Sequence, residues 1–350
     1  NPHIRGMAPY MPAPRQAGYI SLDANESPFD LPASVRKKFL KKIKHLVFNR
    51  YPDGPSTELR RAVGRKTGLP PDWIVAGNGS DELIGCLIDA LAPPGGTVVI
   101  PDPTFVMYER LARIRGARLA KLPLDDQFDL TPAFLDPKLL KSAALWFFAY
   151  PNNPTSNCFS ERLLLTILKR ARGIVVIDEA YVDFSGKTFL PLLRKYPNLV
   201  ILRTFSKALG IALGRVGLAF AHPKITRLLH VVRLPYNLSG LGQALALTTL
   251  ASEREIRQNI ASIVRERRTL LDRLAASTVF FACPTDANFV LVKTARPKKV
   301  FEFLRARGIL IKLFHEPRLQ SYVRITVGRP AEMRRLAEAL DRMENDSWRK

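Results

Sequence analysis

The sequence predicts an α/β protein with two domains, the larger built on a mostly parallel sheet between layers of helices. A chain of 350 residues is too long for one small core and suits a large domain plus a smaller one. From Ile74 onward, short aliphatic runs alternate with helical patterns, which is typical of a parallel sheet covered on both faces. After about Ser252 the pattern changes to a long charged helix followed by an α+β unit. We therefore expect an N-terminal arm over residues 1–30, a large domain over 31–252 and a small α+β domain over 253–350.

The N-terminal segment is predicted to be an arm followed by helices. About 20 residues at the start are rich in proline and show little periodicity. Apolar residues recur at helical spacing over residues 31–48. Ser56 or Thr57 is placed to cap a further helix that runs to about Thr67.

The large domain is predicted from strands that each lead into a helix. In such sheets, crevice sites lie beyond the carboxyl ends of the strands. The expected strands are 75–77, 97–100, 144–148, 173–178 and 199–202, and the first three lead into helices over 80–91, from near Thr104 and from Ser160.

The small domain is predicted to begin with an amphipathic helix that reaches to about Ala276. The elements expected after it are strands at 279–281 and 288–292, a helix from Pro297, strands at 309–311 and 322–325, and a final helix from Ala331.

Composition limits the class of protein. Hydrophobic residues make up 47% and charged residues 24% of the chain, as in ordinary globular proteins, and no apolar run approaches the ~20 residues of a membrane span. Three widely spaced cysteines, Cys86, Cys158 and Cys283, argue against a disulfide framework or a metal site. No secretory signal is recognisable, so we expect a cytoplasmic protein.

The net charge of +23 leaves a nucleic-acid binder as an alternative, because Lys and Arg number 54 against 31 Asp and Glu. However, the basic residues are scattered along amphipathic helices, and the chain has no basic tail and no aromatic-interleaved basic patch. An alkaline surface that attracts phosphorylated substrates is therefore the favoured interpretation.

Two predicted strand ends carry the residues most suggestive of chemistry. Asp178 ends one buried run, and Lys207 follows the next. A carboxylate and an amine on neighbouring strand ends can hold a pyridine nitrogen protonated and present a Schiff-base nucleophile. Ser206 and Arg215 add an anion site beside the amine. Each residue alone has a simpler interpretation as a surface or turn residue, but the combination favours catalysis.

A second anion-binding element is predicted at Gly79, Ser80 and Asp81, which open a helix. Free backbone N–H groups and the helix dipole favour an anion there. The same three residues also make an ordinary helix cap, so the motif alone is a weak signal.

The motifs together resemble the fold-type I, pyridoxal-phosphate-dependent aminotransferases and, within them, the histidinol-phosphate aminotransferases. The resemblance extends from about Arg5 to Leu340. The matching segments are Leu22-Asp23-Ala24-Asn25-Glu26, Arg50-Tyr51-Pro52, Gly77-Asn78-Gly79-Ser80-Asp81-Glu82, Pro151-Asn152-Asn153-Pro154-Thr155, Ser206-Lys207 with Arg215, and Arg324-Ile325-Thr326-Val327-Gly328.

The resemblance implies pyridoxal 5′-phosphate as the cofactor and a role for each matching residue. Lys207 is the lysine that binds the cofactor covalently and later moves a proton. Asp178 pairs with the pyridine nitrogen, and Tyr181 and Asn153 hydrogen-bond the phenolic oxygen. For Asn153, a simple Asn-Pro turn is the alternative.

Two aromatic residues have roles that depend on the same resemblance. Tyr108 matches the ring that stacks on the cofactor, with Phe105 as the competing candidate. Tyr51 matches a position that reaches the phosphate of the neighbouring subunit, which implies a homodimer with shared active sites.

On the substrate side, the resemblance makes Arg324 a carboxylate or phosphate clamp, places Tyr10 and Arg335 near the substrate phosphate, and puts Asn25 in the substrate-side motif. Arg335 lies among basic residues of a helix, so a solvated helix face is an equal alternative. Ser156 and the segment Leu213-Gly214 depart from the usual motifs, which leaves detailed specificity open.

The implied reaction converts histidinol phosphate and 2-oxoglutarate to imidazole acetol phosphate and glutamate, a step of histidine biosynthesis. The alternatives are an aromatic or other amino-acid aminotransferase and a threonine-phosphate decarboxylase. A basic nucleic-acid-binding protein that kept the fold is a rival of another class, which the intact set of Lys207, Asp178 and Arg215 argues against.

Overall fold

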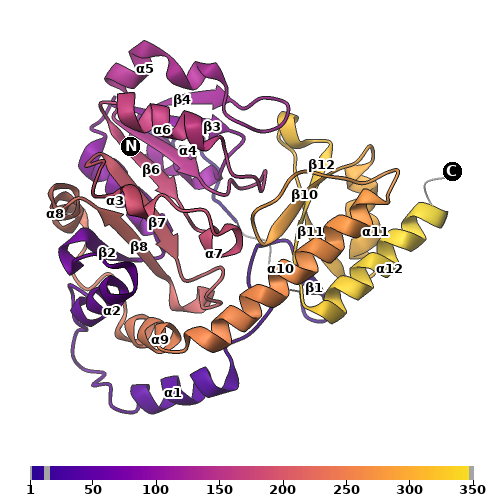
Figure 1. The fold of residues 1–350 in the computed structure, drawn as a ribbon, viewed down its shortest axis with the longest axis horizontal. Helices are drawn as coiled ribbons and strands as arrows, with labels where there is room; N and C mark the ends of the chain where they lie inside the picture. The colour runs from indigo at the N-terminus through magenta and orange to yellow at the C-terminus, as the bar shows by residue number, and fades with distance from the viewer. Residues whose placement is uncertain (1, 12–15, 347–350) are drawn as a thin grey trace.

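The large domain is built on a seven-stranded sheet, as the computed structural model of residues 2–11 and 16–346 shows (Figure 1). Only β8 runs antiparallel to its neighbours, β2 and β7, and the remaining pairs are parallel. In spatial order the strands are β2 (Ile74–Asn78), β8 (Val216–Ala221), β7 (Leu199–Thr204), β6 (Ile174–Asp178), β5 (Leu145–Ala149), β3 (Thr97–Asp102) and β4 (Arg118–Pro123).

Helices cover both faces of this sheet, as the unbroken apolar runs of its strands require. Val176 and Val200 pack on one face, whereas Val175 and Ile201 point to the other, because side chains alternate along a strand. The first face is covered by α3 (Ser80–Leu91), α4 (Val106–Ile114) and α8 (Pro223–Val232). The second is covered by α2 (Thr57–Thr67), α5 (Pro137–Ser142), α6 (Glu161–Arg170) and α9 (Gly240–Leu250).

The small domain contains a five-stranded sheet whose first strand comes from the N-terminal segment. β1 (Ile20–Leu22) pairs in parallel with β11 (Ile309–Leu313). The sheet continues through β12 (Tyr322–Thr326), β10 (Phe289–Lys293) and β9 (Phe281–Ala282). Residues 20–22 thus lie in the predicted arm and belong to the small sheet, while the proposed domain boundaries remain a prediction.

Three helices pack on one face of the small sheet, and the first of them links it to the large domain. They are α10 (Glu253–Ala275), α11 (Pro297–Arg305) and α12 (Pro330–Asp346), and Figure 1 shows α10 running between the two sheets. The shorter helices are α1 (Ala33–Ile43), α7 (Val182–Ser185), and the 3-10 turns η1 (Pro2–Ile4), η2 (Pro71–Trp73), η3 (Pro132–Leu135), η4 (Leu190–Leu192), η5 (Ala212–Gly214) and η6 (Pro317–Leu319).

The predicted fold class is confirmed, and one predicted strand is shorter than expected. Of the predicted run 279–281, only Phe281 belongs to the two-residue strand β9 (Phe281–Ala282). The Ser277 hydroxyl accepts hydrogen bonds from the N–H groups of Val279 and Phe280 and holds them in a turn. Within the described part of the chain, no helix combines the length and the apolar character that a membrane crossing requires.

Candidate active site

The carboxyl ends of β6 and β7 bring Asp178 and Lys207 to the same edge of the large sheet. Asp178 is the last residue of β6 and lies in register with Leu202 of β7, and Lys207 follows three residues after β7 ends. The Lys207 ammonium donates a hydrogen bond to the Ala24 carbonyl, with Nζ and O 3.3 Å apart. It also lies 5.8 Å from the centre of the Tyr181 ring. The predicted carboxylate and amine therefore lie at the same edge of the large sheet, after neighbouring strands.

Asp178 is a buried carboxylate without a cationic partner. It accepts hydrogen bonds from the Tyr108 hydroxyl at 2.7 Å and from the Ala180 N–H at 3.1 Å. Burial raises the pKa of Asp178 to about 6, although both hydrogen bonds lower it. Among the described residues, no Lys, Arg or His forms an ion pair with it. A positively charged group brought next to this carboxylate would restore its ionised form.

Tyr108 lies behind Asp178 and does not face the crevice. Its side chain is fully buried, and its ring stacks on Phe147 at a centroid distance of 5.0 Å. Phe105 meets the Tyr108 ring edge-on at 5.5 Å and is itself only partly buried. Because α4 begins at Val106, Phe105 precedes the helix and stays accessible, while Tyr108 turns inward.

A tight cluster of glycines brings Arg215 over the start of α3. Gly79 has φ of 80°, and a Cβ atom there would lie 2.5 Å from Nη2 of Arg215. A Cβ atom on Gly217 would lie 2.4 Å from the Ser80 nitrogen. Arg215 itself has φ of 48° and contacts Asp81, with Nη2 and Oδ2 3.1 Å apart. Only glycines allow this approach of a guanidinium to a helix N-terminus.

The same cluster fits a phosphate group. The Ser206 hydroxyl is buried and has no hydrogen-bond partner among the described residues. The N-terminus of α3 supplies backbone N–H groups and a favourable dipole. Ser80 opens that helix, and Arg215 is half-exposed above it. An unpartnered hydroxyl, a helix N-terminus and a guanidinium are the donors that a phosphate needs.

Arg324 of β12 provides a second, deeper anion site. It is buried, and its Nη atoms donate to Oδ1 of Asn153 and to the Asp23 carbonyl, both at 2.6 Å. Its Nε has no partner, and no described carboxylate forms an ion pair with it. Burial lowers the pKa of Arg324, with Tyr181, Asp23 and Tyr10 acting in the opposite direction. A buried guanidinium without a counter-ion is suited to an anionic ligand.

Asn25 connects the small sheet that carries Arg324 with Tyr181 of the large domain. It has φ of 54°, and its side-chain amide donates to the Tyr181 hydroxyl at 3.1 Å. Thr326 accepts from the Asn25 N–H at 3.0 Å and donates to its Oδ1 at 3.1 Å. The N-terminal segment, the small sheet and Tyr181 are thereby held together around one residue.

Lys312 was not predicted from the sequence, yet it lies next to Arg324. The two residues are directly paired across β11 and β12, so their side chains project from the same face of the small sheet. Leu291, which pairs with Arg324 on its other side, belongs to the core of the large domain. Lys312 therefore lies on the face that looks toward the large domain. Sequence spacing within one strand gives no signal for such a pairing.

Three other predicted residues lie at the margins or away from the crevice. Tyr10 is exposed but close enough to Arg324 to raise the pKa of its guanidinium group. Tyr51 is 79% exposed and stacks on Tyr236 at 4.4 Å. Arg335 is exposed on α12, whose apolar residues cover the face of the small sheet opposite Arg324. The structure thus does not bring Arg335 to the other site residues.

Comparison with known proteins relates this chain to a known family. The family model of class I and II aminotransferases matches residues 17–340. The chain is 40% identical over 310 residues to the histidinol-phosphate aminotransferase of Thermococcus kodakarensis, covering 89% of this chain and 88% of that protein. It is 38% identical over 321 residues to that of Pyrococcus furiosus, covering 92% and 91%.

Solved structures share the fold. Histidinol-phosphate aminotransferase from Sinorhizobium meliloti in complex with pyridoxal-5′-phosphate superposes with a TM-score of 0.84 at 25% identity, covering 93% of this chain and 90% of that one. L-threonine-O-3-phosphate decarboxylase from Porphyromonas gingivalis superposes with a TM-score of 0.81 at 19% identity, covering 93% and 100%, and so shows a common fold alone.

Proposed function

The chain belongs to the class I and II aminotransferase family, and we propose that it transfers the amino group of histidinol phosphate to 2-oxoglutarate. Relatives named histidinol-phosphate aminotransferase are 35–40% identical to this chain over most of its length. The observation that carries the proposal is the buried, uncompensated Arg324 beside the crevice of Lys207 and Asp178. Both the phosphate of the donor and the carboxylates of the acceptor can occupy such a site.

The cofactor is pyridoxal 5′-phosphate, and the residues present fit it. We propose that Gly79, Ser80 and Asp81 at the start of α3, with Ser206 and Arg215, hold its phosphate. When bound, the cofactor supplies an aldehyde that exchanges the amino group and a ring that accepts electron density.

Asp178, Asn153 and Tyr181 are proposed to orient the ring. Asp178 is the buried carboxylate that can hold a ring nitrogen protonated. Asn153 and Tyr181 present an amide and a phenol that suit the phenolic oxygen. Both also contact the substrate side, Asn153 through Arg324 and Tyr181 through Asn25.

For the ring that faces the cofactor, the geometry favours Phe105 over Tyr108. Tyr108 has no exposed surface, whereas Phe105 does. We assign Tyr108 the role of donating a hydrogen bond to Asp178, since burial and the neighbouring carboxylate raise its pKa well above the ordinary value and keep it protonated.

Lys207 is the amine placed to hold the cofactor covalently and to move a proton. Its Nζ lies 5.8 Å from the centre of the Tyr181 ring and 3.3 Å from the Ala24 carbonyl oxygen, at the sheet edge where β6 ends in Asp178. Within the described residues, no other lysine follows the ends of β6 or β7 so closely.

Arg324 is proposed to bind the substrate anion in both half-reactions, because a planar guanidinium can fork onto a phosphate or a carboxylate. Lys312, its neighbour across the strand pair, adds a second positive charge suited to the dianionic phosphate. Asn25 and Tyr10 complete the substrate side. The location of Arg335 favours a solvated role for that residue.

A homodimer in the cytoplasm is proposed on two observations. Large apolar side chains are exposed around Tyr51, with Leu213 at 93% and Phe48 at 82% exposed. Residues 51–54 contact the segment 233–243. Gly242 of that segment lies against the carbonyl of Gly214, between Leu213 and Arg215 in the chain, so the exposed side chains border one another. A second copy of the chain would cover this surface and bring Tyr51 toward a neighbouring phosphate. All three cysteines are unpaired, as expected in a reducing compartment.

A panel of amino donors with 2-oxoglutarate tests the proposed reaction. We expect kcat/KM for histidinol phosphate to exceed that for phenylalanine or tyrosine by at least about tenfold, because both lack the phosphate that Arg324 and Lys312 suit. Lys312→Gln should weaken histidinol phosphate more than glutamate. Faster turnover of aromatic donors, or release of carbon dioxide from O-phosphothreonine, would support the alternative activities instead.

A further inference from the structure

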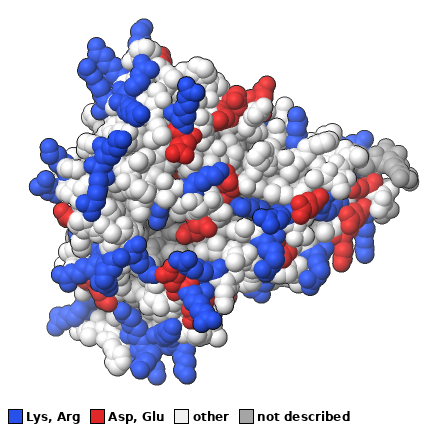
Figure 2. Space-filling model, viewed as in Figure 1, with Lys and Arg blue, Asp and Glu red and all other residues white. Residues whose placement is uncertain are grey.

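A cavity of about 910 Å³ lies between the large sheet and α10, apart from the cofactor crevice. Figure 2 shows this face of the molecule hollowed between α7, α9 and α10. Its walls come from β7, β8, α2, α7, α9 and α10, and none of Lys207, Asp178, Tyr181 or Arg215 lines it. Its volume is typical of sites that hold small organic molecules.

Most of the cavity wall is apolar. The principal apolar residues are Phe205, Leu218, Phe220, Ile256, Ile260 and Val264, the first three from the sheet side and the others from one face of α10. Such a wall favours the non-polar part of a ligand over water.

Two carboxylates line the cavity, and Asp183 of α7 is the one without an ion pair among the described residues, because Glu253 pairs with Lys66 and Arg257. Asp183 is an exposed residue at the edge of the cavity, and desolvation by the surrounding protein raises the pKa of its carboxyl. Arg203 and Arg257 are near enough to lower that pKa, but neither forms an ion pair with it. The carboxylate therefore has cations on its flanks and none in contact.

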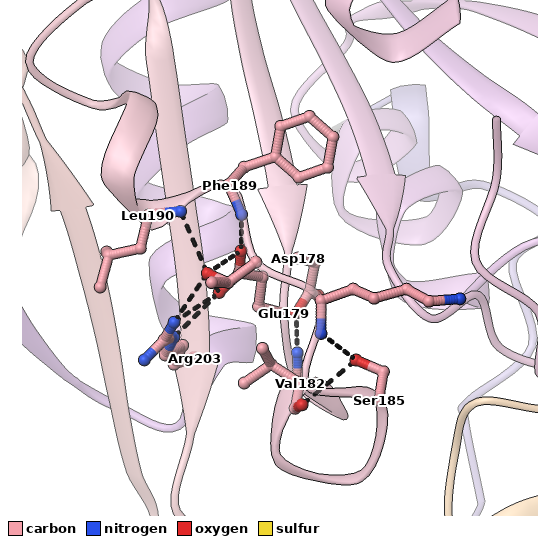
Figure 3. A network of polar contacts seen from close by, with 10 residues as sticks. Asp178, Glu179, Val182, Ser185, Phe189, Leu190 and Arg203 are labelled. Atoms are coloured by element: carbon pink, nitrogen blue, oxygen red, sulfur yellow. Dashed lines mark hydrogen bonds and ion pairs between the residues drawn. The ribbon is translucent and has the colours of Figure 1, made fainter. Parts of the chain in front are cut away.

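The two flanking arginines are each paired with a glutamate and each keep one edge free. Nε and Nη2 of Arg203 donate to Glu179, at 3.0 and 2.8 Å, as Figure 3 shows. Nε and Nη2 of Arg257 donate to Glu253 in the same way. In both guanidinium groups Nη1 has no hydrogen-bond partner among the described residues. One edge of each guanidinium group, that of Arg203 and that of Arg257, thus remains available to an anion.

We propose that this cavity binds a small zwitterion with an apolar side chain, of the α-amino acid class. Its ammonium group pairs with Asp183, its carboxylate with the free edges of Arg203 and Arg257, and its side chain packs on Phe220 and α10. A plain anion would leave Asp183 facing a like charge, and a plain amine would leave the arginines unpaired. A ligand with both charges pairs with all three residues. The other charged residues of the wall are Lys66 and Glu253, which pair with each other, and Arg265 and Arg268.

Occupancy of the cavity would connect the catalytic crevice with the small domain. α7 begins directly after Tyr181, and α10 leads from the large domain into the small one. The ligand would touch both helices, so we expect its binding to change the reaction rate without competition for the substrate.

Calorimetric titration of the holoenzyme with α-methyl-L-phenylalanine tests the proposal. This probe has both charges and an apolar ring, but no Cα proton to lose, so it cannot be transaminated. We expect binding that leaves the visible absorbance of the cofactor unchanged. Asp183→Asn and Arg257→Gln should each raise Kd about tenfold, as should removal of either charge in 3-phenylpropionate or 2-phenylethylamine.

Asp272→Asn is the matched control, since Asp272 is an exposed residue of α10 that does not line the cavity. It should bind the probe as the wild type does. The proposal is overturned if wild-type holoenzyme does not bind the probe at millimolar concentration, if Asp183→Asn binds it equally well, or if binding changes the cofactor absorbance. The comparison of the three ligands on wild-type protein holds even where a variant does not fold.

Discussion

Asp178 and Glu179 are adjacent in sequence and both buried, but they occupy different electrostatic environments. Asp178 faces the cofactor crevice and accepts hydrogen bonds only from neutral donors, the Tyr108 phenol and the Ala180 N–H. Glu179 faces the other way and accepts from the Arg203 guanidinium, the Thr188 hydroxyl and the Phe189 N–H (Figure 3). The Glu179 carboxylate is therefore paired with a cation within the fold, and the Asp178 carboxylate is not.

The same contrast separates two arginines. Arg203 is paired with Glu179, whereas the buried Arg324 donates only to neutral oxygens and keeps Nε unpartnered. A buried charge costs free energy unless it is paired, so a fold keeps an unpaired one only where a ligand completes it. The comparison separates Glu179 and Arg203, which are paired within the fold, from Asp178 and Arg324, for which we propose the cofactor and the substrate as partners.

The largest expected effect is that of Lys207→Ala, which removes the amine from the crevice. Turnover should fall to trace levels, because no other described amine is placed to replace it. Borohydride treatment of the holoenzyme followed by mass spectrometry should find the cofactor fixed to the peptide with Lys207 in the wild type and to no peptide in the variant. Cofactor fixed to another lysine would remove Lys207 from its role.

Arg324→Ala should be next in size. The variant loses a buried, charge-assisted contact in both half-reactions. Its kcat/KM should fall for histidinol phosphate and for glutamate alike, by an amount equivalent to about 2–4 kcal/mol of transition-state stabilisation. Arg335→Ala is the matched control and should change either value less than about twofold, since Arg335 is exposed on the far side of the small sheet.

Single-turnover kinetics of the two half-reactions would check this pair of variants. A defect of Arg324→Ala in one half-reaction only would end the shared-clamp hypothesis. A selective loss of histidinol phosphate in Arg335→Ala would restore the role that the resemblance gives to that residue.

A smaller effect is expected of Tyr108→Phe, which removes one donor from Asp178. Because that hydrogen bond lowers the pKa of Asp178, its loss should raise this pKa further. The cofactor-free protein should lose about 1–3 kcal/mol of unfolding free energy above pH 6, where the carboxylate is ionised, and less below it. Equal losses at pH 5 and pH 8, measured by urea denaturation, would mean that Tyr108 acts through packing alone.

Sequence patterns predicted the strands and helices that carry the site, but missed those fixed by distant contacts. The helix at Ser80–Leu91 was predicted to the residue, because glycine, capping residues and apolar spacing agree there. The three-residue strand β1 and the antiparallel strand β8 were not predicted. β1 forms only by pairing with β11, almost 300 residues later, and β8 pairs with the distant β2. Local pattern carries no information on such pairings.

The sequence motifs predicted which residue types form the site. They predicted less well which side chains face it, because that depends on the orientation of each side chain. Asp178, Ser206 and Lys207 lie at the carboxyl ends of β6 and β7, as the sequence pattern predicts, and Arg215 directly precedes the antiparallel β8 at the same edge. The roles of these residues remain a proposal. The choice between Phe105 and Tyr108 depends on the residue at which α4 begins, and the pairing of Lys312 with Arg324 depends on strand register. Neither boundary nor register is fixed by composition or spacing.

The contrast between Asp178 and Glu179 leads to opposite expectations for the stability of the cofactor-free protein. The pKa of Asp178 is raised from 3.8 to about 6, so its folded form favours the proton, and stability is lost as pH rises through this interval. Asp178→Asn should therefore gain up to about 3 kcal/mol above pH 6, and the Tyr108 hydroxyl can accept from the new amide. Burial raises the pKa of Glu179 as well, although Arg203, the Phe189 N–H and Thr188 act in the opposite direction. Glu179→Gln should nevertheless lose about 2–4 kcal/mol, because Arg203 is left without its carboxylate.

The most direct test is the unfolding free energy of the cofactor-free wild type, Asp178→Asn and Glu179→Gln, measured by urea denaturation at pH 7.5. We predict changes of opposite sign: Asp178→Asn more stable than the wild type yet nearly inactive when the cofactor is restored, and Glu179→Gln less stable. Destabilisation of both variants to a similar extent would contradict the account, because Asp178 would then be a structural carboxylate like its neighbour.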